Sequence, residues 1–177
     1  MKLYLVRHGR TKWNTDRLIQ GRIDVPLCDV GIKDAKRNAK KLKDVKFDIC
    51  YCSPLIRAKE TANIIVDGRC DIVINDLITE RDVGRFEGAP VSSIKARSFW
   101  TVNENMDVDG VENYLQLLAR TKEFLELLKT MYSDETILIV SHSGTIKALH
   151  YNIIGYDNST DFLDFYCGHD DILEYDI

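Results

Sequence analysis

The sequence has no long hydrophobic run and little excess of charge of either sign. No apolar stretch approaches the roughly 18 residues that cross a membrane, and the formal net charge is only −4 over 177 residues. No overall basic field therefore favours nucleic acid or a membrane surface as a partner. The first apolar run begins at Lys2, which leaves no room for a signal peptide. We expect a cytoplasmic protein without a nucleic-acid or membrane partner.

Cysteine is too scarce and too irregularly spaced for a disulfide framework. The five cysteines are an odd number and form no CxxC pair. Cys50 and Cys52 lie two residues apart, so on a strand they would share one face. We interpret them as buried packing residues in a reduced protein rather than as metal ligands. The sequence predicts no metal and no other cofactor.

Linkers, repeats and low-complexity tracts are also absent from the sequence, so we expect one domain over residues 1–177. Charge is nevertheless unevenly placed: seven basic residues lie between Lys33 and Lys46, whereas seven acidic residues and no Lys or Arg follow from Asp157 onward. A solvated helix face is the simplest interpretation of the basic cluster, and a docking surface is the alternative. The two segments could also face each other across the fold or across the contact of a homodimer.

Apolar runs alternate with helical patterns along the chain. The runs predict strands at residues 2–6, 47–52, 72–74, 137–140 and near 163–166. Amphipathic spacing predicts a helix beginning near Gly31 and further helices at residues 112–132 and 145–154. Pro54 is expected to open another helix, which runs to Ile65. This alternation predicts an α/β three-layer sandwich, in which helices cover both faces of a mostly parallel central sheet.

Polar residues follow three of the predicted strands at the point where each strand ends. These groups are Arg7-His8-Gly9, then Ser53-Pro54 with Arg57, and then Ser141-His142-Ser143-Gly144. Ligands bind at the carboxyl ends of parallel strands, arginine suits phosphate oxygens, and histidine can form a covalent intermediate. A histidine after a strand is more often a packed residue, so the Arg-His-Gly motif alone decides nothing. The three groups together indicate a phosphate site at one edge of the sheet.

These motifs resemble those of the histidine phosphatase (phosphoglycerate mutase-like) superfamily. The resemblance runs from residue 2 to about residue 155. It comprises Arg7-His8-Gly9 with Thr11 and Asn14, Gln20-Gly21, Asp24-Val25-Pro26-Leu27 with Gly31, Ser53-Pro54-Leu55-x-Arg57-Ala58 with Thr61-Ala62, Glu80 with Gly84, Glu87-Gly88, and Ser141-His142-x-Gly144. The chain departs from the family pattern at Arg10, Asp34 and Ser143, and none of these departures removes a catalytic group.

The resemblance implies a role for each matching residue. His8 would carry the phosphoryl group, Glu80 would donate a proton, and His142 would complete the catalytic set. The phosphate would be bound by Arg7, Asn14, Arg57 and His142, together with the backbone N–H of Ser143. Weaker substrate contacts are expected from Arg10, Thr11, Gln20 and Gly21. Two arginines and a protonatable histidine would stabilise the transferring phosphoryl group without a metal.

Three functions remain open on these residues. A phosphatase acting on a small phosphomonoester is favoured, because a cap at about residues 85–110 is shorter than in related mutases and leaves a phosphohistidine open to water. A cofactor-dependent phosphoglycerate mutase is the first alternative, and a non-catalytic phospho-ligand-binding module is the second. A metal hydrolase is disfavoured, because the four histidines have no HExxH spacing and the arginines would repel a cation. Phe99 and Trp100 in the cap could contact substrate or anchor the cap.

Overall fold

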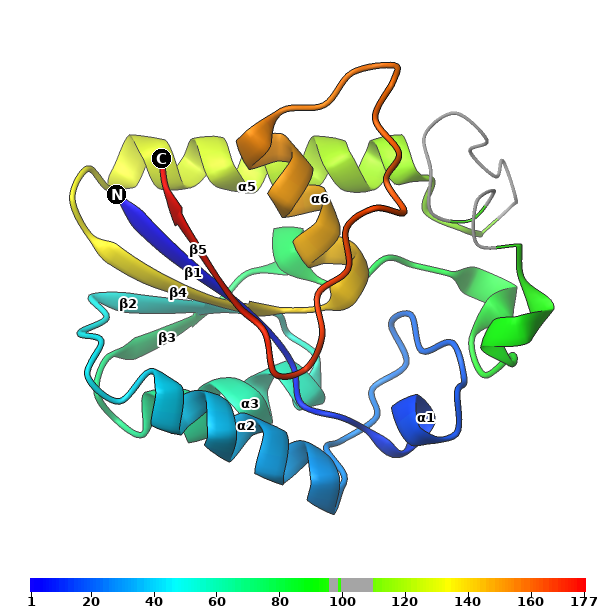
Figure 1. Cartoon of the computed structure of the whole chain (residues 1–177), viewed down its shortest axis with the longest axis horizontal. Coiled ribbons are helices and arrows are strands. Elements are labelled where there is room, and N and C mark those ends of the chain that lie inside the picture. Colours follow the sequence, from blue (N-terminus) through cyan, green and yellow to red (C-terminus); the bar gives the residue numbers. More distant parts are fainter. Residues whose placement is uncertain (96–98, 100–109) are drawn as a thin grey trace.

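A five-stranded sheet forms the centre of the structure, a computed structural model that describes residues 1–95, 99 and 110–177 (Figure 1). The strands are β1 (Lys2–Arg7), β2 (Ile49–Cys52), β3 (Asp71–Ile74), β4 (Thr136–Ser141) and β5 (Ile172–Asp176). Their order is β3-β2-β4-β1-β5. β5 pairs antiparallel with β1, and the other pairs are parallel. The predicted α/β class with a mostly parallel sheet is confirmed.

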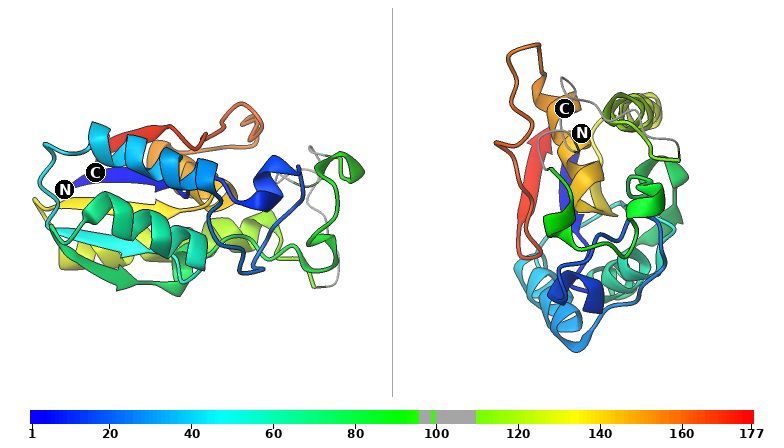
Figure 2. Two further views of the ribbon diagram at one scale, coloured as in Figure 1. Left: turned by 90° about the horizontal axis from the view of Figure 1, so that it is seen from below. Right: turned by 90° about the vertical axis from the view of Figure 1, so that its right-hand side faces the viewer.

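Helices cover both faces of this sheet, as Figure 1 shows and Figure 2 repeats from two other sides. The helices α2 (Asp29–Lys41) and α3 (Ile56–Val66) lie on one face, and α5 (Tyr114–Met131) and α6 (Ser143–Ile154) lie on the other. The short helix α1 (Lys12–Thr15) and the 3₁₀ turns η1 (Asp76–Ile78), η2 (Gly84–Phe86) and η3 (Val91–Ser93) belong to the connections. None of the helices in the described part of the chain combines the length and the apolar character needed to cross a bilayer.

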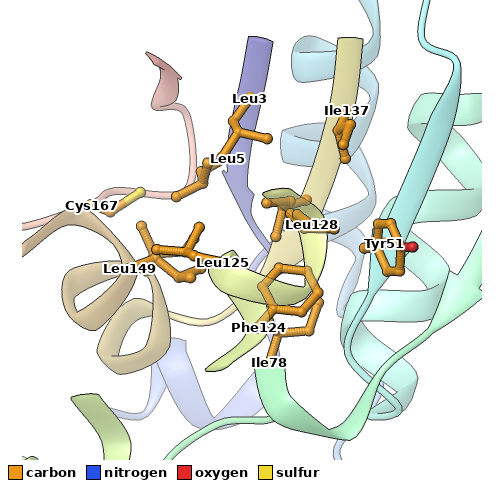
Figure 3. Close-up of a cluster of buried hydrophobic side chains, with 12 residues drawn as sticks. Leu3, Leu5, Tyr51, Ile78, Phe124, Leu125, Leu128, Ile137, Leu149 and Cys167 are labelled. Atoms are coloured by element: carbon orange, nitrogen blue, oxygen red, sulfur yellow. The ribbon is translucent and has the colours of Figure 1, made fainter. Parts of the chain in front are cut away.

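The central strand β4 is buried on both faces, which is why its sequence reads as a continuous apolar run. Ile137 and Ile139 point into the core cluster beneath α5 and α6, whereas Leu138 and Val140 point into the cluster beneath α2 and α3. Figure 3 shows part of the first cluster, in which Leu3, Leu5 and Ile137 of the sheet meet Phe124, Leu125 and Leu128 of α5. Burying each such side chain contributes roughly 1.5–3 kcal/mol. The end of β4 is therefore a rigid platform.

The prediction of a strand near residues 163–166 is wrong, because the last strand of the sheet is β5, at Ile172–Asp176. Residues 163–166 lie instead in a looped segment between α6 and β5. The Asp161 carboxylate accepts a hydrogen bond from the Leu163 N–H at 3.0 Å, and the Asp164 N–H donates to the Asp161 carbonyl at 3.0 Å. In such turns, backbone N–H groups bond to the aspartate instead of to a neighbouring strand, so the segment forms a loop.

Pro54 does not open α3, which begins two residues later, at Ile56, with Leu55 as its N-cap. The Leu55 side chain cannot cap the helix. The Asp24 carboxylate performs this function from a distant loop, because it accepts a hydrogen bond from the Ile56 N–H at 2.6 Å. The remaining predicted helices agree with the structure to within two residues.

The basic cluster meets the acidic C-terminal segment within the chain. The Arg37 guanidinium lies 2.8 Å from the Asp170 carboxylate, and Lys41 Nζ donates to the Asp170 carbonyl at 2.6 Å. Arg37 and Asp170 are both about half exposed, so the pair itself adds little stability. Their contact nevertheless fastens the segment before β5 to α2.

Two glycines allow the loop after β1 to lie directly against the start of α2. A Cβ atom at Gly9 would stand 2.2 Å from the Gly31 carbonyl oxygen, and a Cβ at Gly31 would stand 1.9 Å from the Arg10 carbonyl oxygen. Both distances join backbone to backbone, so no side chain can move aside. This close approach positions the residues that follow His8.

We predict that Gly31→Ala lowers the free energy of unfolding by about 2–3 kcal/mol, because the added methyl group forces two backbone segments apart. Urea unfolding measures this change. The control is Lys33→Ala, an exposed position on the same helix, which should stay within about 0.5 kcal/mol of wild type. Equal unfolding midpoints for Gly31→Ala and wild type would show that the two segments separate without cost.

Candidate active site

Three strand ends bring the expected residues together at the carboxyl edge of the parallel strands. Arg7 ends β1 and is followed by His8, while His142 follows β4 as the N-cap of α6. The ring centroids of His8 and His142 are 5.1 Å apart. Arg57 enters from the first turn of α3, which follows β2.

A cavity of about 420 Å³ opens at this edge, within the range typical of small-molecule sites. One part of its wall is polar and is made by Arg7, His8, Asn14, Gln20, Gly21, Arg57, Glu80, Ser143, Gly144 and Lys147. The other part is formed mainly by apolar side chains and comprises Leu18, Ile19, Val83, Val91, Ile94, Leu163, Phe165 and Tyr166. The cavity can therefore contact both an anionic group and a carbon skeleton.

His8 is held as a neutral imidazole with one nitrogen available. Its Nδ1 lies 2.7 Å from the Gly9 carbonyl oxygen, which can only accept a hydrogen bond, so Nδ1 carries the proton. The Nε2 atom then keeps its lone pair. Burial, followed by the charges of Arg57, His142 and Arg7, holds the pKa of His8 well below its usual range. Nε2 is thus an available nucleophile at neutral pH.

His142 is fully buried and does not line the cavity itself. Its Nε2 lies 2.7 Å from the Ser53 hydroxyl oxygen, so the residue after β2 orients the residue after β4. Burial and then the charges of Arg57 and Arg7 hold the pKa of His142 well below its usual range. Its Nδ1 has no hydrogen-bond partner among residues 1–95, 99 and 110–177. His142 Nδ1 can therefore donate or accept a proton next to His8.

The two arginines of the cavity are oriented by backbone carbonyls rather than by carboxylates. Arg57 donates to the carbonyls of Gly21 and Ile23 at 2.7 and 2.8 Å. Arg7 Nη1 donates to the Tyr166 hydroxyl at 2.9 Å and to the Cys167 carbonyl at 3.0 Å. Burial lowers the pKa of Arg57 to about 10, so it still carries its charge at neutral pH. Neither arginine forms an ion pair with any carboxylate in the described ranges, although the charges of Glu80 and Asp24 act on Arg57 from a longer distance.

Glu80 lies on the cavity wall beside the start of α6. One carboxylate oxygen accepts from the Arg81 N–H at 2.8 Å and from the Thr145 hydroxyl at 3.3 Å. The other oxygen accepts from the Gly144 N–H at 3.3 Å. These contacts fix the carboxyl group in the cavity that His8 also lines, where it can exchange a proton with a bound molecule.

Of the residues expected to make weaker contacts, Gln20 and Gly21 line the cavity, whereas Thr11 and Arg10 do not. Thr11 is the N-cap of α1, and its hydroxyl donates to Gln20 Oε1 at 2.9 Å and to Asn14 Oδ1 at 3.2 Å. It therefore orients Asn14 and Gln20, which do face the cavity.

Arg10 turns toward α2 rather than toward the cavity. Its Nε and Nη2 atoms each lie 2.7 Å from an oxygen of the Asp34 carboxylate. Asp34 is fully buried, and Arg37 contacts it as well. Burial acts to raise the pKa of Asp34, but the hydrogen bonds and the charge of Arg10 outweigh it and lower the pKa. Because the N–H donors of Arg10 are bonded to Asp34, they are not available to bind a substrate.

Comparison with known proteins decides the family. The model of the histidine phosphatase superfamily (branch 1) matches residues 3–167. The chain belongs to this superfamily. The resemblance stated from the sequence motifs is thereby confirmed over nearly the whole chain.

Relatives within the superfamily have different activities. The chain is 37% identical to uncharacterized phosphatase PhoE of Bacillus subtilis, over 86% of this chain and 77% of that protein. It is 30% identical to a 2,3-bisphosphoglycerate-dependent phosphoglycerate mutase of Methylobacterium sp., over 89% of this chain and 83% of that protein. The crystal structure of the α-ribazole phosphatase from Shigella flexneri superposes with a TM-score of 0.87 and 29% identity, covering 100% of this chain and 91% of that one.

The expected cap lies only partly within the described residues of this superfamily member. Val91 and Ile94 line the cavity. Phe99 is buried in a cluster with Ile19 and Val83, so its ring anchors this region to the core. Trp100, the other aromatic residue considered for substrate contact, lies outside the described residues.

Sequence reasoning missed three residues that contribute to the site. Lys147 lines the cavity one helical turn beyond Ser143, and helical spacing could have revealed it. Tyr166 contacts Arg7, and His169 Nδ1 lies 2.7 Å from the His8 carbonyl oxygen. No local sequence signal could reveal these two contacts, because they join residues about 160 positions apart. Among the residues that the structure describes, no group of three or more His, Cys, Asp or Glu is arranged to hold a metal ion.

We predict that the protein loses stability as the pH falls below about 6.5, the pKa of histidine in an unfolded chain. The unfolded chain binds protons there, whereas the folded chain keeps His8 and His142 neutral, because their pKa values are lowered. The free energy of unfolding should fall by roughly 1 kcal/mol for each of these histidines between pH 7.5 and pH 5.5. Urea unfolding at both pH values measures the drop.

The matched variants are His8→Ala, in which the drop should shrink by roughly 1 kcal/mol, and Lys129→Ala on the exposed face of α5, which should keep the wild-type drop. An unchanged drop in His8→Ala would mean that His8 is protonated in the folded protein.

Proposed function

We propose that this superfamily member is a metal-independent phosphatase that hydrolyses a small phosphomonoester through a phosphohistidine at His8. The observation that supports this most directly is that one cavity is lined by a neutral, oriented His8 and by Arg7 and Arg57, neither of which is ion-paired among the described residues. A phosphate group is the ligand that needs both features. It attracts the arginines, and its phosphorus accepts the imidazole lone pair.

In the first step, the phosphoryl oxygens contact Arg7 and Arg57, and His8 Nε2 attacks the phosphorus atom. The N–P bond forms as the P–O bond to the leaving group breaks. The leaving oxygen takes a proton from Glu80. The Gly9 carbonyl, which accepts from Nδ1–H, stabilises the positive charge that develops on the imidazole. The negative charge on the equatorial oxygens is stabilised by the arginines, by His142 and by the N–H groups at the start of α6, including that of Ser143.

In the second step, a water molecule attacks the phosphohistidine. The Glu80 carboxylate takes a proton from this water, and the N–P bond breaks. Inorganic phosphate leaves, and His8 returns to its neutral form. Glu80 thus acts first as an acid and then as a base, which requires that it hold a proton when the substrate binds and that it contact the oxygen that leaves and the oxygen that arrives. Asn14 and Gln20 on the cavity wall add polar contacts to the bound phosphate.

A phosphoglycerate mutase is the second candidate, because a mutase is among the relatives at 30% identity. The two functions differ in what accepts the phosphoryl group from His8: water in a phosphatase, another substrate hydroxyl in a mutase. Incubation with 3-phosphoglycerate and a trace of bisphosphate separates them. Release of phosphate supports hydrolysis, and formation of 2-phosphoglycerate without phosphate release supports the mutase.

The setting of the reaction is also part of the proposal. The partner is a small phosphorylated molecule, and the protein acts in the cytoplasm as one domain with a cap at about residues 85–110. The possible homodimer stays a prediction, since the contact between the acidic and basic segments on which it rested is made within one chain. Light scattering measures the oligomeric state.

We predict that His8→Ala abolishes hydrolysis of p-nitrophenyl phosphate in EDTA, because no other residue in the described part of the cavity is an oriented neutral imidazole. Wild-type protein quenched at alkaline pH should yield a peptide with phosphate on His8, as detected by mass spectrometry. Lys129→Ala, on the exposed face of α5, serves as the control and should keep wild-type turnover. Persistent turnover in His8→Ala would exclude the phosphohistidine mechanism.

We predict that the effect of Glu80→Gln depends on the leaving group. An alkyl phosphate needs a proton on its leaving oxygen, so its kcat should fall by about 10²–10⁴-fold. p-Nitrophenolate leaves without a proton, so formation of its phosphohistidine should be much less affected. Pre-steady-state release of nitrophenol measures that step. Equal losses for both substrates would assign Glu80 a purely structural role.

A further inference from the structure

The peptide group that joins His8 to Gly9 is held at both of its polar atoms. On one side, the His8 carbonyl oxygen lies 2.7 Å from His169 Nδ1. A carbonyl oxygen can only accept a hydrogen bond, so His169 Nδ1 carries a proton and donates it. On the other side, the Gly9 N–H donates to the Thr61 hydroxyl at 3.0 Å. The two contacts together fix the plane of the peptide group that follows the nucleophile.

The orientation of this peptide group affects which nitrogen of the His8 ring is free. The Gly9 carbonyl oxygen lies 2.7 Å from His8 Nδ1, accepts its proton in a hydrogen bond and thereby leaves Nε2 unprotonated. The position of this carbonyl depends on the backbone torsions of Gly9, and glycine restricts its torsions less than any other residue. A contact that fixes the preceding peptide group therefore also restricts where the Gly9 carbonyl can lie.

The segment that carries His169 is itself fastened to α2. Asn38 Nδ2 donates to the His169 carbonyl at 2.9 Å, and Asn38 is buried. Arg37 and Lys41 contact the carboxylate and the carbonyl of the next residue, Asp170, at 2.8 and 2.6 Å. All three side chains belong to one helix, so the backbone of His169 has a fixed support. The hydrogen bond to His8 therefore comes from a donor that cannot easily move away.

His169 contacts the ring of His8 as well as its backbone. The two ring centroids are 5.6 Å apart, and the rings meet edge to face at 67°. His169 is not among the described residues that line the cavity, so it acts on His8 rather than on a bound molecule. Burial, followed by the charge of Arg7, lowers the pKa of His169 to about 4. At neutral pH it is therefore a neutral donor beside His8 and adds no charge to the site.

We propose that His169 is a positioning residue for the nucleophile, whose Nδ1–H holds the His8–Gly9 peptide group so that His8 presents an unprotonated Nε2 to phosphorus. The proposal rests on the phosphatase function proposed above and adds a residue to its mechanism. Without this donor, the peptide group keeps only its contact with Thr61, and His8 samples its other tautomer. Arg7 has other partners, so we expect phosphate binding to be retained.

The kinetic test uses variants of His169 that keep or lose the donor. Asn places an amide N–H near the position of the imidazole Nδ1–H, Gln places it one methylene farther out, and Leu has no donor. In His169→Leu, the rate constant of phosphohistidine formation should fall by about 10–100-fold, while the inhibition constant of inorganic phosphate changes by less than about twofold. Pre-steady-state release of nitrophenol from p-nitrophenyl phosphate measures this step.

The polar variants keep the test valid even if His169→Leu does not fold. His169→Asn should recover most of the wild-type rate constant, and His169→Gln should not. Lys122→Leu, at an exposed position on α5, is the control and should behave as wild type. Equal losses in His169→Asn and His169→Gln, accompanied by weaker phosphate inhibition, would assign His169 a purely structural role and overturn the proposal.

The tautomer of His8 is measured without turnover. In protein labelled with ¹⁵N-histidine, NMR at neutral pH should show wild-type His8 protonated at Nδ1 and unprotonated at Nε2, with the resonances assigned from their absence in His8→Ala. Both resonances should move toward a mixture of tautomers in His169→Gln and stay in place in His169→Asn.

The two measurements distinguish failure of this proposal from failure of the proposed function. If wild type hydrolyses no phosphomonoester while the tautomer changes as expected, the phosphatase function is wrong and the positioning role of His169 stands. If wild type forms phosphohistidine, and His169→Gln forms it at the same rate with an unchanged spectrum, the positioning role is wrong and the phosphatase stands.

Discussion

The hydrogen-bonded pairing of β1 with β4 determines where the two histidines of the active site lie relative to each other. The register places Arg7 opposite Ser141, and the His8 N–H continues the ladder by donating to the Ser141 carbonyl at 2.9 Å. The next residue on each strand is a histidine, so the parallel pairing brings His8 and His142 side by side. A shift of one residue would turn the apolar side chains of β4 to the wrong faces and separate the two rings. The packing of Ile137 to Val140 in two cores therefore also protects the geometry of the site.

The site concentrates the positive charge of Arg7 and Arg57, neither of which forms an ion pair within the described residues. Arg7 and Arg57 are held by carbonyls and a hydroxyl, and Lys147 lines the same cavity. Burial first, and then charges that include those of Arg57 and Arg7, lowers the pKa values of His8 and His142 and keeps both rings neutral. The same charge that costs folding stability makes His8 a nucleophile and attracts an anion to it. The charges that the reaction requires thus lower the stability of the fold, and burial of apolar side chains in the two hydrophobic cores offsets this loss.

The sequence predicted well whatever depends on local patterns. The apolar runs before His8 and His142 are strands because both faces of the sheet are covered, and the motif residues at their ends converge because parallel strands end at one edge. Local patterns could not show that Asp24 caps α3, that Arg10 pairs with Asp34, or that residues 163–166 form a loop over the cavity. The first two depend on contacts between segments far apart in the chain, and the loop depends on turns at Asp161 that compete with strand pairing. The roles of His8, Glu80 and the phosphate-binding residues remain proposals that the geometry supports.

The segment between α6 and β5 explains how the site is held ready before a ligand arrives. Tyr166 and Cys167 orient the Arg7 guanidinium, His169 contacts the His8 carbonyl, and Asp170 fastens the segment to α2. Leu163, Phe165 and Tyr166 of the same segment line the cavity. One loop therefore orients Arg7 and also supplies apolar side chains to the cavity wall. Because the Arg7 side chain is already oriented before a ligand binds, substrate binding does not carry the entropic cost of ordering it. Substitutions in this loop therefore reach the chemistry at His8 through Arg7, through the His8 backbone and through the ring contact between His169 and His8.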